Sequence, residues 1–291
     1  MITIRLNGGV GNKMFQVAAT YSLALYNKDE CAFNMQDHVV HQGNSAYTYK
    51  TSIFKKLNDL PSGWQADHYY EEPRPNYTPI PYYKNMMLKG YFASEKYFAT
   101  FKNKVIDLFK EREMIANIKN KYNELWDNSV SVHIRRGDYV KSASVLLTMD
   151  YYNTAIERLE QTKKIDHIIV ISDDIPWCKD NFKDARAVFI EGEPDYVDLY
   201  IQTLCNHNII SNSSFSWWGS YLNENVNKIV YAPSLWFDDD EYRDFKDFFC
   251  DNWVLIENHP TRRDSNYDGL KYTYGEVMSI MEGRENKYKR H

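Results

Sequence analysis

Two adjacent arginines, followed by a glycine and an aspartate, form the segment of this chain with the clearest capacity for chemistry. They follow the stretch Val130–Ile134, where apolar residues alternate as in a half-buried strand, and are Arg135, Arg136, Gly137 and Asp138. Paired guanidinium groups hold a planar, multiply charged anion such as a diphosphate through bidentate hydrogen bonds. The aspartate can orient one guanidinium, and the glycine lets the backbone turn sharply. On this segment alone, a salt-bridged strand end is an equal alternative.

Two other polar segments follow predicted strands. One comes after an apolar stretch at 167–171 and consists of Ser172, Asp173 and Asp174. Its carboxylates can accept hydrogen bonds from ribose hydroxyls or a purine edge, and capping of the next helix is an equal alternative. The other offers hydroxyl and backbone N–H groups where a helix begins, and consists of Asn212, Ser213, Ser214, Phe215 and Ser216. A helix start suits phosphate binding, with a serine-rich cap as the alternative.

A further candidate is Asn12, at the end of the glycine-rich segment Asn7–Asn12. This segment lacks the GxGxxG spacing of a dinucleotide fingerprint, but its glycines allow the backbone to approach a ligand closely. The Asn12 amide would lie near the start of a helix. There it either caps the helix, which this segment alone favours, or hydrogen-bonds a sugar or a reacting hydroxyl.

Alternating strands and helices are expected to position these side chains. The second half of the chain predicts strands at 129–134, 167–171, 187–190, 208–211 and 228–232, and helices at 149–163 and 195–205. The first half predicts a strand at 1–6, a helix at 14–26, an irregular stretch at about 36–83, a helix from 94 and helical periodicity over 103–126. Such an order indicates a parallel sheet, whose ligands lie beyond the carboxyl ends of the strands. The three polar segments of the second half can therefore converge on one cleft.

The length of 291 residues suits two domains of ordinary size. We place the boundary near 120–130, which gives an N-terminal domain at 1–125, a second domain at 126–257 and a C-terminal extension at 258–291. The sequence indicates no role for the extension. Its last part, 283–291, is locally basic and is most simply a solvated tail, with weak membrane-surface or partner contact as the lesser alternative.

The bulk composition excludes several classes of protein. A net charge of −5 and a pI of about 5.9 argue against a general nucleic-acid-binding surface. Four cysteines without a CxxC pair indicate neither a zinc site nor a disulfide framework. No signal segment or membrane-spanning apolar run is evident, so we expect a cytoplasmic soluble protein or the trimmed soluble part of a longer one. The 24 tyrosines and 7 tryptophans suit interfaces and carbohydrate clefts, although partial burial explains most of them.

Four segments in this order resemble the motifs of family 11 glycosyltransferases, the α-1,2-fucosyltransferases. They are Gly8–Gln16, Gly90–Phe98, His133–Tyr139 and Asn212–Gly219, and the resemblance covers about residues 1–256. Four motifs in order are far more specific than any one alone. The chain departs from the family pattern, with positions that bear on the acceptor or the inter-domain cleft, at Lys13, Val17 and Ala93.

The resemblance implies an α/β fold of the GT-B type, with two Rossmann-like domains facing a central cleft. It implies GDP-β-L-fucose as donor, bound mainly by the second domain, inversion at the anomeric carbon, and neither a metal nor another cofactor. Arg135 would contact the β-phosphate, and Arg136 would brace the loop through Asp138. His133 would fix the strand end or contact GDP. The same donor site would include Ser172, Asn212, a phosphate cradle of Ser213, Ser214 and the Phe215 backbone, and a guanosine contact from Asp173 or Asp174; Asn12 would lie beside the reacting sugar.

The expected reaction is transfer of fucose to the 2-hydroxyl of a terminal β-galactoside on an oligosaccharide or surface glycan. Its general base stays open among Glu95, Asp37 and Asp138. One rival hypothesis is an enzyme of the same fold with another nucleotide deoxysugar or a UDP-sugar. The other is a carbohydrate-binding protein without catalysis, against which the diphosphate clamp argues. The sequence does not indicate which glycan is the acceptor.

Two patterns have the spacing of metal ligands. One is a DxD pattern by which some glycosyltransferases hold a divalent metal, formed by Asp238, Asp239 and Asp240. It lies in an acidic stretch away from the strand ends, so we favour a solvated loop. The other is the pair His38 and His41, for which no further ligand is evident and a polar surface pair is favoured. We therefore predict no metal site.

Overall fold

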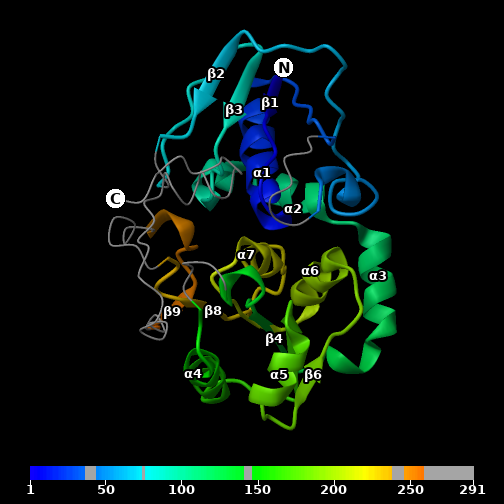
Figure 1. The fold of residues 1–291 in the computed structure, drawn as a ribbon, viewed down its shortest axis with the longest axis vertical. Helices are drawn as coiled ribbons and strands as arrows, with labels where there is room; N and C mark the ends of the chain where they lie inside the picture. The colour runs from blue at the N-terminus through cyan, green and yellow to red at the C-terminus, as the bar shows by residue number, and fades with distance from the viewer. Residues whose placement is uncertain (37–43, 74–75, 141–145, 238–245, 259–291) are drawn as a thin grey trace, which may run out of the picture. The chain divides into compact units, whose positions relative to one another are not determined.

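The computed structural model describes residues 1–36, 44–73, 76–140, 146–237 and 246–258. These residues form two compact α/β units (Figure 1). Unit 1 contains Met1–Glu111 and the described part of 244–250, and unit 2 contains the described residues from Arg112 to 237 and from Asp251 on. The division precedes the position near residue 125 expected from the sequence, because the helix at 112–121 packs within unit 2.

Unit 1 is built on a three-stranded parallel sheet in the order β1-β3-β2. The strands are β1 (Ile2–Ile4), β2 (His68–Glu71) and β3 (Met86–Lys89), and the helices are α1 (Val10–Asn27) and α2 (Lys102–Phe109). Short 3-10 turns η1 (Ala46–Tyr49), η2 (Glu95–Tyr97), η3 (Ala99–Phe101) and η7 (Lys246–Phe248) complete it. Helix α1 packs against β1, α2 and η2 and is buried over most of its length.

Unit 2 holds a six-stranded parallel sheet in the order β6-β5-β4-β7-β8-β9. Its strands are β4 (Ser129–Ile134), β5 (His167–Ser172), β6 (Ala187–Phe189), β7 (His207–Ile209), β8 (Val230–Pro233) and β9 (Val254–Ile256). Its helices are α3 (Arg112–Lys121), α4 (Met149–Glu160), α5 (Ile175–Asn181), α6 (Asp195–Leu204) and α7 (Ser214–Tyr221), with 3-10 turns η4 (Asn123–Leu125) and η5 (Asp138–Val140). Figure 1 shows α4 and α5 on one side of this sheet and α6 and α7 on the other.

In strand β4, the alternating apolar and polar residues point to opposite faces of the sheet. Val130, Val132 and Ile134 face an apolar core formed with α4 and α5. The intervening polar residues are buried as well, not exposed as a half-buried strand would leave them. On that face the Asn208 amide donates to Ser131 Oγ at 2.7 Å. Hydrogen bonding of this kind makes burial of a polar strand face tolerable.

The α/β class and the parallel sheets predicted from the sequence are confirmed. Helix α1 begins at Val10 rather than near residue 14, since Gly9 in an extended conformation forms its N-cap. The helical periodicity over 103–126 is divided between α2 and α3, because Lys110 is extended (ψ 112°). The helix expected from Ser94 is two 3-10 turns, because Phe98 between them departs from helical geometry (φ −138°, ψ 5°). The stretch expected to be irregular contains η1 and β2.

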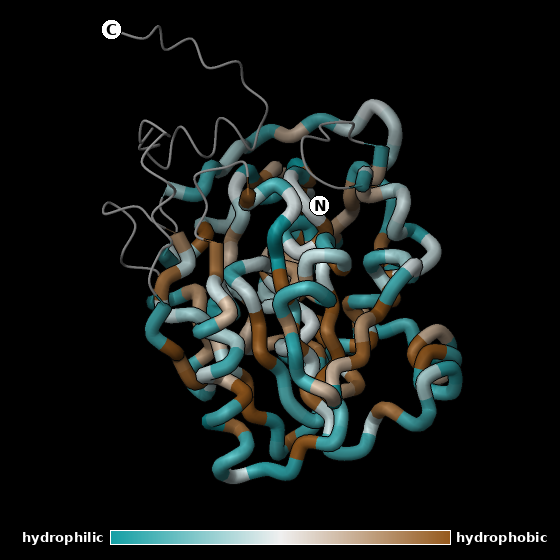
Figure 2. Tube along the Cα trace, turned by 60° about the horizontal axis from the view of Figure 1, so that its bottom comes forward, coloured by the Kyte–Doolittle hydropathy of each residue, from teal (hydrophilic) through white to brown (hydrophobic). Residues whose placement is uncertain are grey.

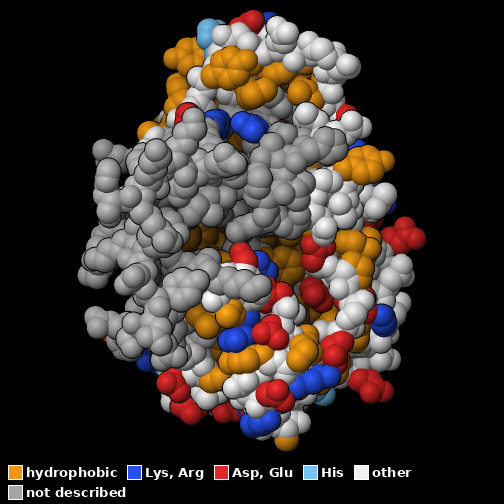
Figure 3. Space-filling model, viewed as in Figure 1, with side chains coloured by type: hydrophobic (Ala, Val, Ile, Leu, Met, Phe, Trp, Pro, Cys, Tyr) orange, Lys and Arg blue, Asp and Glu red, His pale blue; other side chains and the backbone are white. Residues whose placement is uncertain are grey.

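Hydrophobic and charged residues are distributed along the chain and over its surface as expected for a globular protein. Along the tube of Figure 2, hydrophobic stretches alternate with hydrophilic ones, as expected for core elements joined by surface loops. Acidic and basic side chains are interspersed over the visible face of unit 2 in Figure 3, so no large patch of one sign appears there. Hydrophobic side chains are exposed on unit 1 in the same view, and the exposed tyrosines of this unit are Tyr26, Tyr47, Tyr69, Tyr77, Tyr82 and Tyr83.

Candidate functional site

The three polar segments predicted in the second half of the chain lie at one edge of the sheet of unit 2. Strand β4 is hydrogen-bonded to β5 on one side and to β7 on the other, and all three are parallel. Their carboxyl ends therefore carry Arg135, Asp173 and the loop that begins at Ile210 side by side. The structure brings the segments together as the sequence predicts.

Arg135 is held between two carboxylates. Its Nη2 lies 2.5 Å from Asp138 Oδ1, and its Nη1 lies 2.7 Å from Asp173 Oδ2. A guanidinium has five N–H donors, so two ion pairs orient the group and still leave donors for an anion. The expected partnership of Arg136 with Asp138 is corrected, because the structure pairs Asp138 with Arg135.

Arg136 instead braces the neighbouring loop. Its Nε donates to Asp174 Oδ2 at 3.0 Å, and its guanidinium carbon lies 3.8 Å from the centre of the Trp177 ring. Its backbone N–H donates to Asp173 Oδ1 at 2.8 Å. Ion pairing and stacking on an aromatic face together make this arginine a fixed part of the site.

Gly137 allows this close approach of the two loops. A Cβ atom at this position would lie 2.4 Å from Asp173 Oδ2, which is too short for any real contact. The glycine predicted to permit a turn therefore has a second role: it makes room for the carboxylate that pairs with Arg135.

His133 fixes the end of strand β4, which was one of the two roles expected for it. Its Nδ1 lies 2.8 Å from Ser211 Oγ, and its ring centre lies 5.2 Å from that of Phe215. The side chain is 4% exposed, and burial, followed by the charge of Arg135, lowers its pKa to about 3. The imidazole is therefore neutral near pH 7, and the fixed positive charge of the site comes from the arginines.

The segment 212–215 begins helix α7. Ser213 is its N-cap and accepts from the Phe215 N–H at 3.4 Å, so the capping alternative is observed. Asn212 is 1% exposed; its side-chain amide donates to Trp236 O at 3.0 Å, and its backbone carbonyl accepts from the Tyr139 hydroxyl at 2.9 Å. Asn212 thus holds the loop in place, while Ser214 follows it at the first helical position.

The segment 172–174 shows the same combination. Asp174 is the N-cap of α5 and accepts from the Trp177 N–H at 3.2 Å, while Ser172 Oγ accepts from the Asp174 N–H at 3.0 Å. Capping is therefore confirmed here too. Asp173 lies between Ser172 and this cap, and its carboxylate is paired with Arg135. Contacts of these residues with a nucleotide remain a prediction.

Asn12 lies in the first turn of α1, in unit 1. The N-cap is Gly9 and makes no side-chain capping bond, so the cap role favoured for Asn12 is wrong. Its amide forms no hydrogen bond with the described residues and is close to Gly8, whose φ of 76° requires glycine.

Glu72 is a candidate that the sequence did not reveal. Its Oε2 accepts from the backbone N–H groups of Tyr91 at 2.7 Å and Phe92 at 2.9 Å, inside the second motif. A Cβ at Gly90, which has a φ of 147°, would lie 2.4 Å from Glu72 Cβ. Glu72 stands in a stretch without periodicity, and no local signal links it to partners about 20 residues away.

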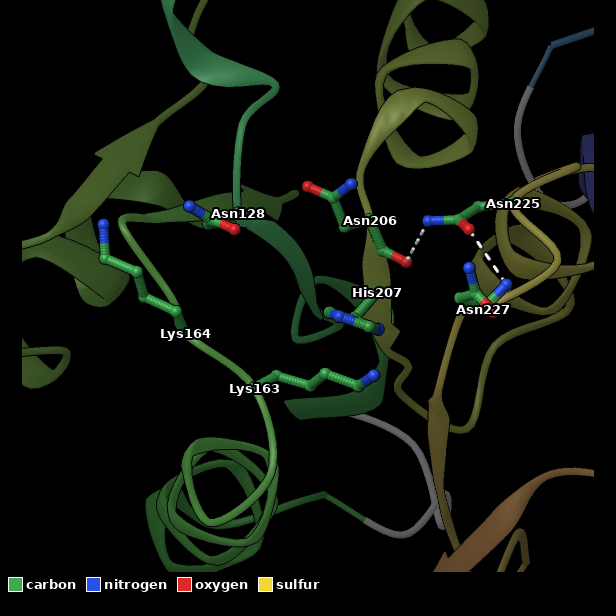
Figure 4. A pocket seen from close by; sticks show the side chains of 7 residues that line it. All are labelled: Asn128, Lys163, Lys164, Asn206, His207, Asn225 and Asn227. Carbon is green, nitrogen blue, oxygen red and sulfur yellow. Dashed lines mark hydrogen bonds between the residues drawn. The ribbon is translucent and has the colours of Figure 1, made fainter.

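A pocket of about 260 Å³ lies at the opposite edge of the sheet of unit 2 (Figure 4). It contains none of the predicted site residues and is lined by Asn128, Lys163, Lys164, Asn206, His207, Asn225 and Asn227. Asn128 precedes β4 and His207 begins β7, so the pocket is at the amino ends of the strands. The Asn225 amide donates to Asn206 O at 3.1 Å across it.

Several predicted features lie outside the described residues: Asp37, His38, His41, the Asp238–Asp240 pattern and the basic segment. Among the residues that the structure does describe, no group of three or more His, Cys, Asp or Glu is arranged to hold a metal ion. Within the same residues, no helix is both long and apolar enough to cross a membrane.

Comparison with known proteins finds a matching family and similar glycosyltransferases. Residues 1–257 match the family described as glycosyl transferase family 11. The chain is 31% identical over 292 residues to an alpha-1,2-colitosyltransferase of Escherichia coli, covering 88% of this chain and 99% of that protein. It is 29% identical to the O-antigen biosynthesis glycosyltransferase WbnK of Escherichia coli, with 80% and 93% covered.

Other similar proteins are named fucosyltransferases. Galactoside alpha-(1,2)-fucosyltransferase 2 of Oryctolagus cuniculus is 25% identical, with 76% of this chain and 67% of that protein covered. Among solved structures, NodZ alpha-1,6-fucosyltransferase soaked with GDP-fucose is 13% identical with a TM-score of 0.47, covering 76% of this chain and 92% of that one. The family match and the colitosyltransferase relative decide the assignment: the chain belongs to glycosyl transferase family 11 and is a glycosyltransferase.

Proposed function

We propose that this enzyme transfers L-fucose from GDP-β-L-fucose, with inversion, to the 2-hydroxyl of a terminal β-galactoside. The observation that carries the proposal is the placement of Arg135 at the carboxyl edge of the sheet, oriented by Asp138 and Asp173. The departing diphosphate gains negative charge as the glycosidic bond breaks, and preorganised donors stabilise such charge most effectively. Names of relatives that carry α-1,2-fucosyltransferase activity support the sugar and the linkage.

The residue roles follow from this geometry. Arg135 donates to the β-phosphate, while Arg136 keeps the loop rigid through Asp174 and Trp177. The start of α7 offers its first backbone N–H groups and Ser214 to the same diphosphate. The remaining members of the expected donor site are His133, Asp138, Ser172, Asp173, Asn212, Ser213 and Phe215, of which His133 and Asn212 act by holding the loops.

We assign the donor to unit 2 and the acceptor to unit 1. Asn12, whose amide has no partner among the described residues, then lies beside the reacting sugar. We place the enzyme in the cytoplasm, where it contacts the membrane surface through the basic segment 283–291. The donor is a substrate, and the proposed reaction uses no metal or other cofactor.

The proposal is tested with purified protein in two steps. GDP should raise the melting temperature and UDP should not, because the site is expected to recognise guanosine. GDP-fucose is then incubated with lactose, N-acetyllactosamine and other β-galactosides, and NMR identifies the linkage formed. Stabilisation by UDP alone, or release of no GDP from GDP-fucose with any acceptor or water, would contradict the donor assignment.

One observation supports GDP-colitose as an alternative donor. The relative with 31% identity is named a colitosyltransferase, and colitose is fucose without its 3-hydroxyl group. A site built to hydrogen-bond that hydroxyl rejects the deoxy analogue strongly, whereas an apolar site does not. Comparing kcat/KM for GDP-fucose and GDP-colitose on one acceptor decides between them. The same measurement addresses the non-catalytic alternative, since a carbohydrate-binding protein turns over neither donor.

A further inference from the structure

Glu72 lies on the same edge of the unit 1 sheet as the loop that carries Asn12. It directly follows β2, Gly90 directly follows β3, and the glycine-rich loop follows β1 in this parallel sheet. Gln16 joins the segments that follow β1 and β3: its Oε1 accepts from the Asn7 N–H at 2.9 Å and its Nε2 donates to Gly90 O at 3.0 Å. Glu72 and Asn12 thus belong to one hydrogen-bonded edge.

The two carboxylate oxygens of Glu72 have different surroundings. Oε2 is held by two short backbone hydrogen bonds, from Tyr91 at 2.7 Å and Phe92 at 2.9 Å. Among the described residues, the only hydrogen-bond partner of Oε1 is the Tyr97 hydroxyl, at 3.5 Å, the outer limit of a hydrogen bond. The side chain is partly exposed. One oxygen therefore fixes the carboxylate, and the other remains able to take a proton.

The electrostatic surroundings of Glu72 favour proton uptake. No lysine or arginine among the described residues forms an ion pair with it, and Lys89 on the adjacent strand pairs with Glu71. The titratable groups that face it are the phenols of Tyr70 on β2 and Tyr97 on η2. Burial raises the pKa of Glu72 to about 7. A base whose pKa lies near the working pH is the most effective.

The alternatives expected from the sequence are less suitable. Asp138 is committed to the ion pair with Arg135. The Glu95 carboxylate forms no hydrogen bond or ion pair with the described residues, so nothing there orients it. Glu72 also has an aromatic surface nearby, because the ring of Tyr77, which is 38% exposed, lies 4.9 Å from that of Tyr97. Exposed rings of this kind stack on sugar faces.

We propose that Glu72 is the general base of the transfer. Its Oε1 takes the proton of the acceptor 2-hydroxyl while that oxygen forms a bond to C1 of fucose. The bond from C1 to the β-phosphate oxygen breaks, and its electron pair leaves with GDP; the proton then passes from Glu72 to solvent. This assignment rests on the proposed function, because it names the base of that reaction.

The test compares Glu72→Gln with the matched control Glu71→Gln, an exposed carboxylate on β2, using GDP-fucose and lactose. Glutamine keeps an oxygen that accepts from the two backbone N–H groups but has no capacity to take the proton. We expect kcat/KM to fall ~10²- to 10⁴-fold in Glu72→Gln and to stay near the wild-type value in the control. At about pH 8, the melting temperature of Glu72→Gln should not be lower than that of the wild-type protein, because the change removes a buried charge.

Two further readouts separate a base from a structural brace. Wild-type kcat/KM should rise with pH through about 7, and this limb should be absent in Glu72→Gln. Sodium azide, a nucleophile that carries no proton, should restore GDP release in Glu72→Gln with formation of fucosyl azide. A wild-type profile without this limb, retention of more than about a tenth of the activity in the variant, or failure of azide to restore GDP release overturns the proposal.

The proposed function can fail separately. If wild-type protein releases GDP from GDP-colitose but not from GDP-fucose, the donor assignment is wrong, and the same variants are compared with the active donor. The rise of wild-type kcat/KM with pH also tests the role of Glu72 if the variant fails to fold.

Discussion

At the scale of single residues, the site depends on the partners of Arg135. Asp138 and Asp173 hold the guanidinium from two directions, with contacts of 2.5 and 2.7 Å. A group oriented in advance costs no reorganisation when charge develops on the leaving diphosphate. The same two carboxylates would be left without their cation if the arginine were removed, so the order of the two loops depends on it.

We predict that Arg135→Ala lowers kcat by at least ~10²-fold, the usual effect of removing one donor to a developing anion. Arg135→Lys should recover only part of the loss, because an ammonium group does not bind in a bidentate manner. Steady-state kinetics with GDP-fucose and lactose measure both. Arg158→Ala, an exposed arginine on α4, is the matched control, and near-normal turnover of Arg135→Ala would remove the phosphate-clamp role.

His133 gives a second residue-scale prediction, about pH. Its pKa is lowered from 6.5 to about 3, so the unfolded chain binds a proton below 6.5 that the folded chain does not. The free energy of unfolding should therefore fall as the pH drops from 6.5 toward 3, by about 2 kcal/mol at about pH 5. Urea unfolding at about pH 7.5 and pH 5 measures this loss. In His133→Asn the loss should be smaller by that amount, and equal losses in both proteins would show that His133 titrates normally.

At the scale of elements, helices α6 and α7 pack at unusually close range through Gly219. A Cβ there would lie 2.8 Å from three atoms of Gln202, including its Cβ, which the backbone of α6 holds in place. The helix that begins at the expected phosphate site therefore has its position set by a glycine facing a neighbouring helix. The sequence motif contains this glycine, but only the packing shows its purpose.

We predict that Gly219→Ala destabilises the protein by about 1–3 kcal/mol, since the two helices must separate to accept the methyl group. Denaturant unfolding measures the change. Gly9→Ala is the matched control, because nothing lies within 4 Å of a Cβ at that position. A loss of stability in Gly219→Ala no larger than in the control would mean that the helices adjust without cost.

At the scale of the whole molecule, the absence of a metal requirement can be tested directly. Fixed positive charge at Arg135 and donors at the start of α7 are expected to stabilise the leaving GDP. Activity should therefore survive treatment with EDTA. Complete loss of activity with EDTA, restored by a divalent cation and abolished by Asp238→Asn, would make the DxD pattern a metal site.

The C-terminal extension provides a second prediction at this scale. The family match ends at 257, and Asn258 accepts from the Leu235 N–H at 2.9 Å, so a chain ending at 258 keeps this contact. We expect residues 1–258 to retain stabilisation by GDP. We also expect the full chain, but not 1–258, to bind vesicles containing phosphatidylserine in a co-sedimentation assay. Equal binding of both forms would remove the membrane role of the basic segment.

The sequence by itself determined the parallel α/β organisation and most of the candidate site. Both come from local signals: the alternation in Val130–Ile134 predicts β4, and parallel strands place Arg135 and Asp173 at a common edge. The four ordered motifs identified the family for the same reason, since each is continuous in the chain. Caps such as Ser213 and Asp174 are also local and were among the alternatives.

Only the tertiary structure decided which groups become partners. Asp138 lies with Arg135 rather than Arg136, because Arg136 turns toward Asp174, which is 38 residues away. His133 meets Ser211 across 78 residues, and Glu72 meets the Gly90–Phe92 turn from a stretch with no periodicity. Such pairings depend on how strands are ordered and how closely loops approach, and a local pattern carries no information on either. The convergence of the three polar segments at one edge of the sheet was therefore predictable, whereas the pairing of their side chains and the position of Glu72 were not.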